Sequence, residues 1–188
     1  MPTPQDEFGI DWDKEAERCV AVVKEGYPDC SIFGYFKEFI KPDMSVLEVG
    51  CNIANWYPTW RSLEPSIKYT GIDFSETGLR IARERYPVAS FVFSNAKEMI
   101  FDQQFDVVFT HTMLQHVSIE TKKILAPRIW GALKPDGFLI IQENTATVSD
   151  GTWPNREGWI NFFEGYGFKL IKAHDIGGGG TGFVFQKV

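Results

Sequence analysis

The stretch that decides the fold is SVLEVGCNIAN, residues 45–55. Its first residues form a short apolar run that holds one acid, Glu48, and is closed by Gly50. Such a run is typical of a buried strand followed by a turn. Because Gly50 has no Cβ, the backbone can turn sharply there and approach a ligand closely. We therefore predict a strand over residues 45–50 that leads into a binding loop.

Working outward from this stretch, apolar runs alternate with segments whose apolar residues recur at helical spacing. The predicted strands are 45–50, 69–73, 90–93, 105–110, 138–142, 169–173 and 183–186. The predicted helices are 11–25, 31–40, 76–86, 119–133 and 159–166, with Ser75 as the N-cap of the third and a turn over 134–137 after the fourth.

This alternation predicts one α/β domain over residues 1–188, doubly wound, with helices on both faces of a mostly parallel seven-stranded sheet. The glycine run 177–180 joins the last two strands, so we expect them to form an antiparallel pair. Residues 1–44 would form an N-terminal helical cap on a core of residues 45–188.

Composition indicates a single domain and disfavours a nucleic-acid-binding protein. The 188 residues are 44% hydrophobic, which suits a single domain with a real core. The net charge of -6 disfavours nucleic acid as a partner, because nucleic-acid binders gather Lys and Arg into a stripe. The basic residues Arg80, Arg83 and Arg85 alternate with Glu84, which predicts a solvated helix face.

Cysteines and the N-terminus indicate the compartment. The three cysteines, Cys19, Cys30 and Cys51, form no CxxC pair, so we expect neither a zinc site nor a disulfide framework. The N-terminus is polar and acidic, unlike a signal peptide, and no apolar run approaches the roughly 20 residues that cross a bilayer. We expect a cytoplasmic protein that does not bind membranes.

In an open parallel sheet, ligands bind beyond the carboxyl ends of the strands. The segments that follow the predicted strands are 48–54, 73–75, 95–96, 110–112 and 142–145. Asp73 ends the second strand, where a carboxylate can accept hydrogen bonds from a ribose diol. A glycine turn followed by this acid predicts a nucleotide-like ligand.

Six segments in order resemble one family. They are VLEVGCNIAN (46–55), GIDFSETGLRIARERY (71–86), SFVFSNAKEM (90–99), FDVVFTHTMLQHV (105–117), LKPDGFLIIQEN (133–144), and GYGFKLIKAHD with FVFQKV (165–175 and 183–188). Together they resemble the motifs of class I S-adenosylmethionine (SAM)-dependent methyltransferases, which have a Rossmann-like core. The resemblance implies SAM as cofactor and S-adenosylhomocysteine as product.

The resemblance also implies roles for single residues. Glu48 and Gly50 would line the methionine part of SAM, Asp73 would hold the ribose, and Phe74 would pack beside the adenine. Asn95 and Ala96 would contact the adenine, and Thr110 and His111 would lie near the sulfonium.

The chain departs from the family pattern at three positions. Asn52 and Ala54 replace the second and third glycines of the family's G-x-G-x-G loop. Asn tolerates positive φ better than most residues and Ala adds only one methyl, so we expect the loop to keep its shape. Asn95 replaces an acid and keeps one carbonyl acceptor for the adenine.

Methyl transfer needs a base only where the accepting atom carries a proton. His111 is the candidate catalytic base, because a histidine changes charge near neutral pH. His116, Glu143, Asn144 and Trp153 are candidate substrate contacts, His116 through packing or a lid contact. We expect Glu143 and Asn144 to form a polar wall and not a metal site.

The sequence therefore predicts transfer of a methyl group from SAM to oxygen or nitrogen of a small-molecule acceptor, such as a sugar or another metabolite. Three alternatives remain open: a non-catalytic SAM-binding partner protein, a methyltransferase acting on protein or nucleic acid, and a nicotinamide-dependent reductase. The reductase is disfavoured because the first loop lacks G-x-G-x-x-G.

Overall fold

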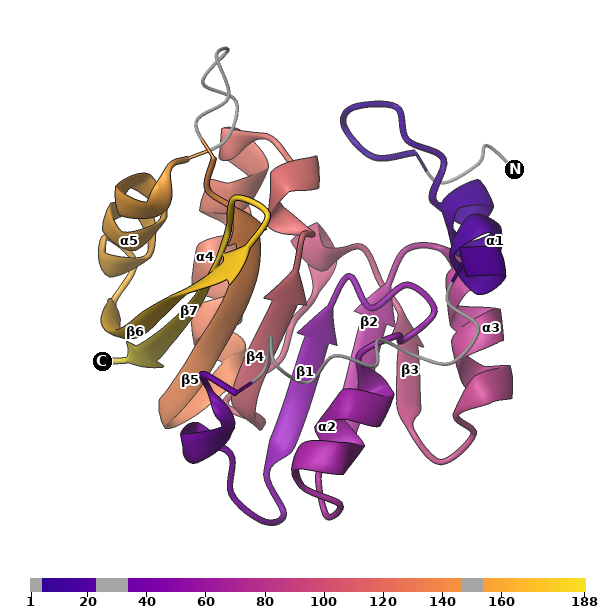
Figure 1. The fold of residues 1–188 in the computed structure, drawn as a ribbon, viewed down its shortest axis with the longest axis horizontal. Helices are drawn as coiled ribbons and strands as arrows, with labels where there is room; N and C mark the ends of the chain where they lie inside the picture. Colours follow the sequence, from indigo (N-terminus) through magenta and orange to yellow (C-terminus); the bar gives the residue numbers. More distant parts are fainter. Residues whose placement is uncertain (1–4, 23–33, 147–153) are drawn as a thin grey trace. The chain divides into compact units, whose positions relative to one another are not determined.

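The computed structural model describes residues 5–22, 34–146 and 154–188, with the backbone alone at 21 and 22. These residues gather into two compact units, 1–99 and 100–188 (Figure 1). The strand order is β3-β2-β1-β4-β5-β7-β6, which confirms the predicted seven-stranded, mostly parallel sheet. The divisions 1–44 and 45–188 remain a prediction.

Unit 1 is built on three parallel strands, in which β1 pairs with β2 and β2 with β3. Its elements are α1 (Trp12–Val22), η2 (Lys37–Phe39), β1 (Ser45–Val49), α2 (Tyr57–Leu63), β2 (Lys68–Asp73), α3 (Glu76–Arg85), β3 (Ser90–Phe93) and η3 (Ala96–Glu98). The predicted N-cap is confirmed, because Ser75 Oγ accepts from Gly78 N at 2.9 Å. Figure 1 shows α3 beside β3.

The helix predicted over 31–40 is wrong in its described part, which holds only the single 3₁₀ turn η2. Phe36, at the start of this turn, is fully buried, and its ring centroid lies 5.3 Å from that of Trp60 in α2. After the turn, Ile40 is extended, two residues before Pro42. Burial of one large side chain and the nearby proline therefore outweigh helical spacing here.

Unit 2 contains the antiparallel end of the sheet. Its elements are β4 (Phe105–His111), η4 (Leu114–His116), α4 (Ile119–Ala132), β5 (Leu133–Asn144), α5 (Arg156–Glu164), β6 (Phe168–Gly177) and β7 (Gly180–Lys187). β4 and β5 are parallel, whereas β7 runs antiparallel to both β5 and β6. Gly178 and Gly179 both have positive φ, as a tight two-residue hairpin turn requires. The predicted antiparallel pair is confirmed.

The turn predicted at 134–137 lies inside β5 and does not precede it. The pairing with β4 jumps from Leu133 to Phe138, and Asp136 takes a left-handed φ of 60°. Lys187 explains why the strand can begin early. Its Nζ donates to the carbonyl oxygens of Trp130 at 2.8 Å and Leu133 at 2.6 Å, where α4 ends.

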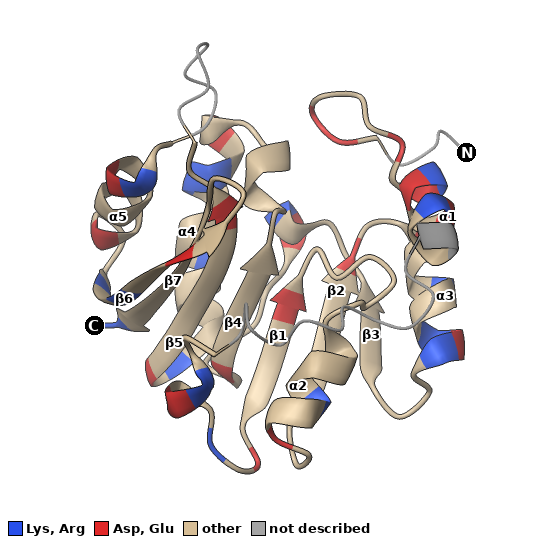
Figure 2. Cartoon of the chain, in the orientation of Figure 1, with Lys and Arg blue, Asp and Glu red and all other residues tan. Residues whose placement is uncertain are grey.

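Acidic and basic residues are interspersed along α3 and α4, as the colours of the cartoon in Figure 2 indicate. Within the described ranges, no helix is long and apolar enough to cross a membrane. The same ranges hold no cluster of three His, Cys, Asp or Glu side chains that could bind a metal ion.

Candidate cofactor loop and acceptor-side residues

The loop after β1 alternates left-handed residues with ordinary ones. Gly50, Asn52 and Ala54 have φ of 77°, 46° and 55°. These are the three glycine positions of the G-x-G-x-G pattern, so the loop keeps its shape although only one glycine remains. Ala54 N donates to Cys51 O at 2.7 Å, which closes the turn. Left-handed residues other than glycine are unfavourable and need support from their surroundings.

Asp73 ends β2 beside this loop and joins two backbone segments. Its Oδ2 accepts from Asn52 N and its Oδ1 from Ser75 N, both at 2.8 Å. Burial raises the pKa of the Asp73 carboxyl, and these backbone N–H bonds oppose the rise. A carboxylate has about four acceptor sites, so Asp73 keeps capacity for further hydrogen bonds.

Glu48 lies within β1 and is almost fully buried, with 2% of its surface exposed. The hydroxyl of Tyr69 donates to its Oε2 at 2.6 Å. Burial raises the pKa of the Glu48 carboxyl to about 8, with a smaller contribution from the charge of Asp73. The side chain is therefore largely protonated at neutral pH in the ligand-free protein.

The loop after β3 carries the predicted adenine contacts. Asn95 caps the turn η3, because its Oδ1 accepts from Lys97 N at 3.0 Å. Ser94 N donates to Asp73 O at 2.9 Å, which brings this loop beside Asp73. Ala96 is buried and Phe74 half-buried. Asp73 therefore contacts both the loop after β1 and the loop after β3, and the cofactor roles of the residues in these loops remain a prediction.

Two contacts of unit 1 were missed by the sequence analysis. Asp13 of α1 accepts at Oδ1 from Ser75 Oγ at 2.6 Å and from Thr77 N at 3.2 Å. It therefore fastens α1 to the first turn of α3, where a negative charge is favourable. No local pattern indicates this contact, because more than sixty residues separate the partners.

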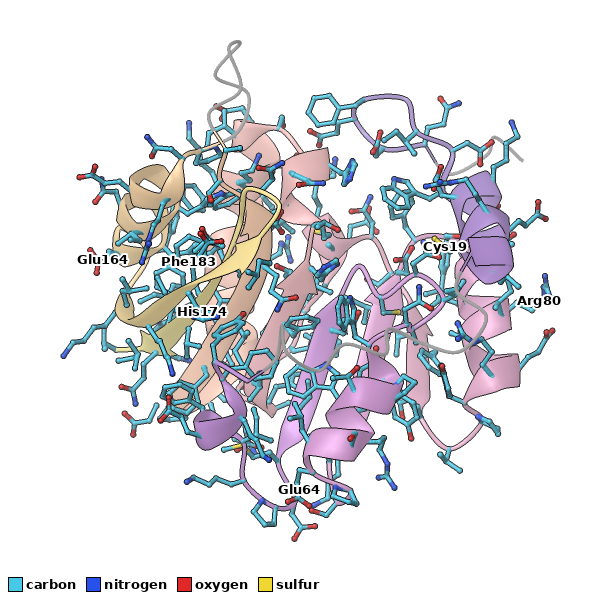
Figure 3. The ribbon with its side chains drawn as sticks, in the orientation of Figure 1. Cys19, Glu64, Arg80, Glu164, His174 and Phe183 are labelled. Atoms are coloured by element: carbon cyan, nitrogen blue, oxygen red, sulfur yellow. The ribbon has the colours of Figure 1, made fainter. Side chains whose placement is uncertain are left out.

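Arg85 corrects the predicted solvated face of α3. Arg80 fits that prediction, since it pairs with Glu84 at 2.8 Å and extends outward in Figure 3. Arg85 instead turns to the loop after β1. Its Nη1 donates to Ile53 O at 3.2 Å and to Asn55 Oδ1 at 3.0 Å.

In unit 2, three residues at the end of β4 are unusual. Thr110 is fully buried, and its Oγ1 has no hydrogen-bond partner among the described residues. Burial lowers the pKa of the His111 imidazole to about 4, so the ring is neutral at pH 7. Thr112 has φ of 51°, a strained conformation for a β-branched residue, and its Oγ1 lies 3.2 Å from His111 Nδ1.

Glu143 of β5 holds the turn that follows these residues. Its Oε1 accepts from Leu114 N at 3.0 Å and its Oε2 from Gln115 N at 3.2 Å. Burial raises the pKa of Glu143 to about 8, against the effects of these N–H groups and of the buried Lys122. The carboxyl therefore bonds to its own chain, and its predicted contact with substrate stays a prediction.

The substrate roles predicted for Asn144, His116 and Trp153 remain a prediction. Asn144 bonds to its own chain, through Oδ1 to Ala146 N at 2.8 Å and through its carbonyl to Trp159 Nε1 at 3.4 Å. His116 lies in η4, with Nε2 3.3 Å from Gln115 Nε2. Trp153 lies outside the described residues. His174 is exposed on β6 (Figure 3).

The stretch that contains the cofactor loop matches a known protein family. A family model described as a methyltransferase domain matches residues 46–137, from β1 through the cofactor loop and η4 into β5. Residues 46–137 of the chain belong to this methyltransferase domain family. The predicted family and fold class are confirmed.

Curated methyltransferases resemble parts of the chain. Trans-aconitate 2-methyltransferase of Variovorax paradoxus is 37% identical over 98 residues, 52% of this chain and 37% of that protein. Demethylmenaquinone methyltransferase of Listeria welshimeri is 30% identical over 134 residues, 68% of this chain and 53% of that protein. The chain thus matches about half or less of the length of these methyltransferases.

Two solved methyltransferases share the fold. A SAM-dependent methyltransferase from Aquifex aeolicus has a TM-score of 0.73 and 17% identity, covering 94% of this chain and 98% of its own. Phosphoethanolamine N-methyltransferase 2 of Haemonchus contortus, in complex with S-adenosyl-L-methionine, has a TM-score of 0.72 and 21% identity, covering 87% of this chain and 43% of its own.

Proposed function

We propose that this methyltransferase transfers a methyl group from SAM to a small-molecule acceptor. The observation that carries the proposal is the loop after β1, which keeps left-handed backbone at residues 50, 52 and 54 beside the buried Asp73. The conformation persists without two of its glycines, which indicates that it is needed for binding and not a by-product of flexible residues.

The residues of unit 1 fit the cofactor. Gly50 leaves room for a ligand against the backbone, and Asp73 keeps acceptor capacity for ribose hydroxyls. Asn52 contributes through its left-handed backbone, with a φ of 46°, because its buried Oδ1 lies against Gly78 of α3. Phe74, Asn95 and Ala96 would hold the adenine.

The protein's own contribution is to bind, orient and exclude water. When bound, SAM would supply an electrophilic methyl group. Glu48 would face the amino group of the methionine part, and a nearby positive charge would lower its raised pKa so that it ionises on binding. Asp73 and the loop would fix the ribose.

We assign the acceptor side of the reaction to unit 2. His111 would take the proton from the accepting oxygen or nitrogen, because its imidazole is neutral at pH 7 and can accept. Thr110, with its unsatisfied buried hydroxyl, and His116 would contact the cofactor and the acceptor, respectively. A small acceptor is supported by relatives named for trans-aconitate and demethylmenaquinone.

Calorimetric titration with S-adenosylhomocysteine tests the cofactor. We expect saturable binding, no binding of NADH, and at least about tenfold weaker binding in Asp73→Asn. Asp106→Asn is the matched control, because Asp106 is a partly exposed carboxylate paired with Lys134 in unit 2. A folded protein that binds no S-adenosylhomocysteine would contradict the proposal.

Turnover separates the enzyme from its alternatives. Conversion of SAM to S-adenosylhomocysteine would be followed with panels of small carboxylic acids, phenols, quinols and sugars. Acceptor-dependent conversion supports the enzyme. Binding without conversion by any of these panels, by peptides or by RNA would favour a SAM-binding partner protein, and conversion with peptides or RNA alone a macromolecular substrate.

A further inference from the structure

The end of α3 holds the cofactor loop at residues that Asp73 does not contact. Arg85 Nη1 has two hydrogens, which go to Ile53 O and to Asn55 Oδ1 at 3.2 and 3.0 Å. Both acceptors flank Ala54, one of the two left-handed residues of this loop that are not glycine. Hydrogen bonds from a charged donor are stronger than neutral ones, so this contact is suited to fix an unfavourable backbone conformation.

A single face of α3 supports the loop at two levels. Gly78 and Arg85 are seven residues apart, which is about two helical turns and places them on the same face. A Cβ on Gly78 would lie 2.9 Å from Asn52 Oδ1, so the loop rests closely on the helix there. One turn after the buried Ala82, Arg85 makes the second contact between this face of α3 and the loop, through Ile53 O.

The aromatic side chains next to Arg85 extend the support to α2. The guanidinium carbon lies 5.1 Å from the ring centroid of Tyr86. The Tyr86 ring is in turn 4.9 Å from that of Tyr57, the first residue of α2. Stacking on an aromatic face restricts the orientation of the guanidinium, which makes its two hydrogen bonds more specific.

We propose that Arg85 is a positioning residue that holds loop 50–55 in its cofactor-binding conformation, in place of the backbone freedom that Asn52 and Ala54 lack. The inference deepens the proposed function and rests on it. Arg85 acts through the loop and needs no contact with the cofactor. Its effect is therefore on cofactor affinity and on loop order, and not on the chemical step.

The test compares two arginines of one helix. Arg83 also donates to a backbone carbonyl, that of Phe91 at 3.0 Å, but outside the loop. In Arg85→Met we expect about tenfold faster hydrogen exchange at the amides of Asn52 and Ala54 and about tenfold weaker binding of S-adenosylhomocysteine. Arg85→Lys should recover part of both, because it can keep one hydrogen bond. Arg83→Met should change neither by more than about twofold.

Each outcome bears on one of the two claims. Absence of binding in the wild type would reject the proposed function, while exchange at the two amides still shows whether Arg85 orders the loop. Unchanged exchange in Arg85→Met, or equal effects of Arg85→Met and Arg83→Met, would overturn the inference. So would faster exchange with unchanged affinity. In turnover, a raised KM for SAM with unchanged kcat supports it, and a lowered kcat with unchanged KM overturns it.

Discussion

The loop after β1 and the loop after β4 each follow a parallel strand, and each is held by a buried acid at the end of a neighbouring strand. Asp73 of β2 divides its two oxygens between two segments, at Asn52 and Ser75. Glu143 of β5 gives both oxygens to one turn, at Leu114 and Gln115. The buried acid therefore links two loops in unit 1, whereas the buried acid in unit 2 holds a single turn.

The surroundings of the two acids differ as well. Asp73 lies near a second acid, Asp13, which contributes to raising its pKa. Glu143 lies near the buried cation Lys122, whose Nζ donates to Val117 O at 2.5 Å. A buried carboxyl beside a cation is a structural pair, whereas an acid without one gains from a ligand with hydrogen-bond donors. We therefore expect variants in the two loops to have separable effects.

The largest effect should come from the loop after β4. We expect His111→Gln to lower kcat by about 10²–10⁴-fold, as loss of a general base does, and to leave the affinity for S-adenosylhomocysteine unchanged. Steady-state kinetics and calorimetry measure the two, with the exposed His174→Gln as control. Because the pKa of His111 is about 4, kcat/KM should show no acid limb from this residue between pH 5.5 and 8. Unchanged kcat would remove His111 from the mechanism.

Glu143→Gln should cost the next largest amount. The amide can accept only one of the two backbone N–H bonds and turns its NH₂ group toward the other donor, so we expect about 2 kcal/mol lower free energy of unfolding. Urea unfolding measures it. Glu120→Gln on α4 is the control, because its pair with Lys123 is exposed. If Glu143→Gln lowered the free energy of unfolding no more than Glu120→Gln does, the turn would be stable without the Glu143 carboxyl.

The two buried glutamates give a smaller, pH-dependent effect. Glu48 and Glu143 have pKa values near 8 in the folded state against 4.5 ordinarily, so the folded state keeps protons that the unfolded chain has released. Stability then falls as pH rises through 4.5–8. His111 has the opposite effect, because its lowered pKa makes stability rise with pH up to about 6.5.

Of these three groups, only the two carboxyls bind protons differently in the folded and unfolded states between pH 6.5 and 8, so Tm should fall by several degrees across this window. Thermal scans of the ligand-free protein measure it. Glu48→Gln should flatten the slope, because an amide does not titrate. A Tm that rises with pH in this window would contradict the assignment of raised pKa values to these acids.

The smallest effect concerns the left-handed residues. Ala54→Gly relieves an unfavourable φ of 55° but loosens the unfolded chain, so we expect a net gain of about 0.5 kcal/mol. Ala82→Gly is the matched control inside α3, where the same change should lose about 1 kcal/mol. Denaturant unfolding of both variants compares them. A loss at Ala54 equal to that at Ala82 would mean that the loop is not strained.

Much of the fold and of the cofactor site could be predicted from local patterns. The run SVLEV, the cap Ser75 and the acid Asp73 have the predicted places in the structure, because strand burial, capping and strand-end position depend on neighbouring residues. The family resemblance also predicted the topology of the sheet. Six motifs in one order determine that topology, whereas a single motif does not.

Only the tertiary structure decided which side chains support the site. Asp13 and Arg85 look like ordinary surface charges in the sequence, yet each bonds to a loop or a helix end that folding brings to it. The 3₁₀ turn at Lys37–Phe39 and the early start of β5 were likewise set by the burial of Phe36 and the contacts of Lys187. Local sequence determines conformational preference, whereas long-range contacts stabilise the exceptions to it.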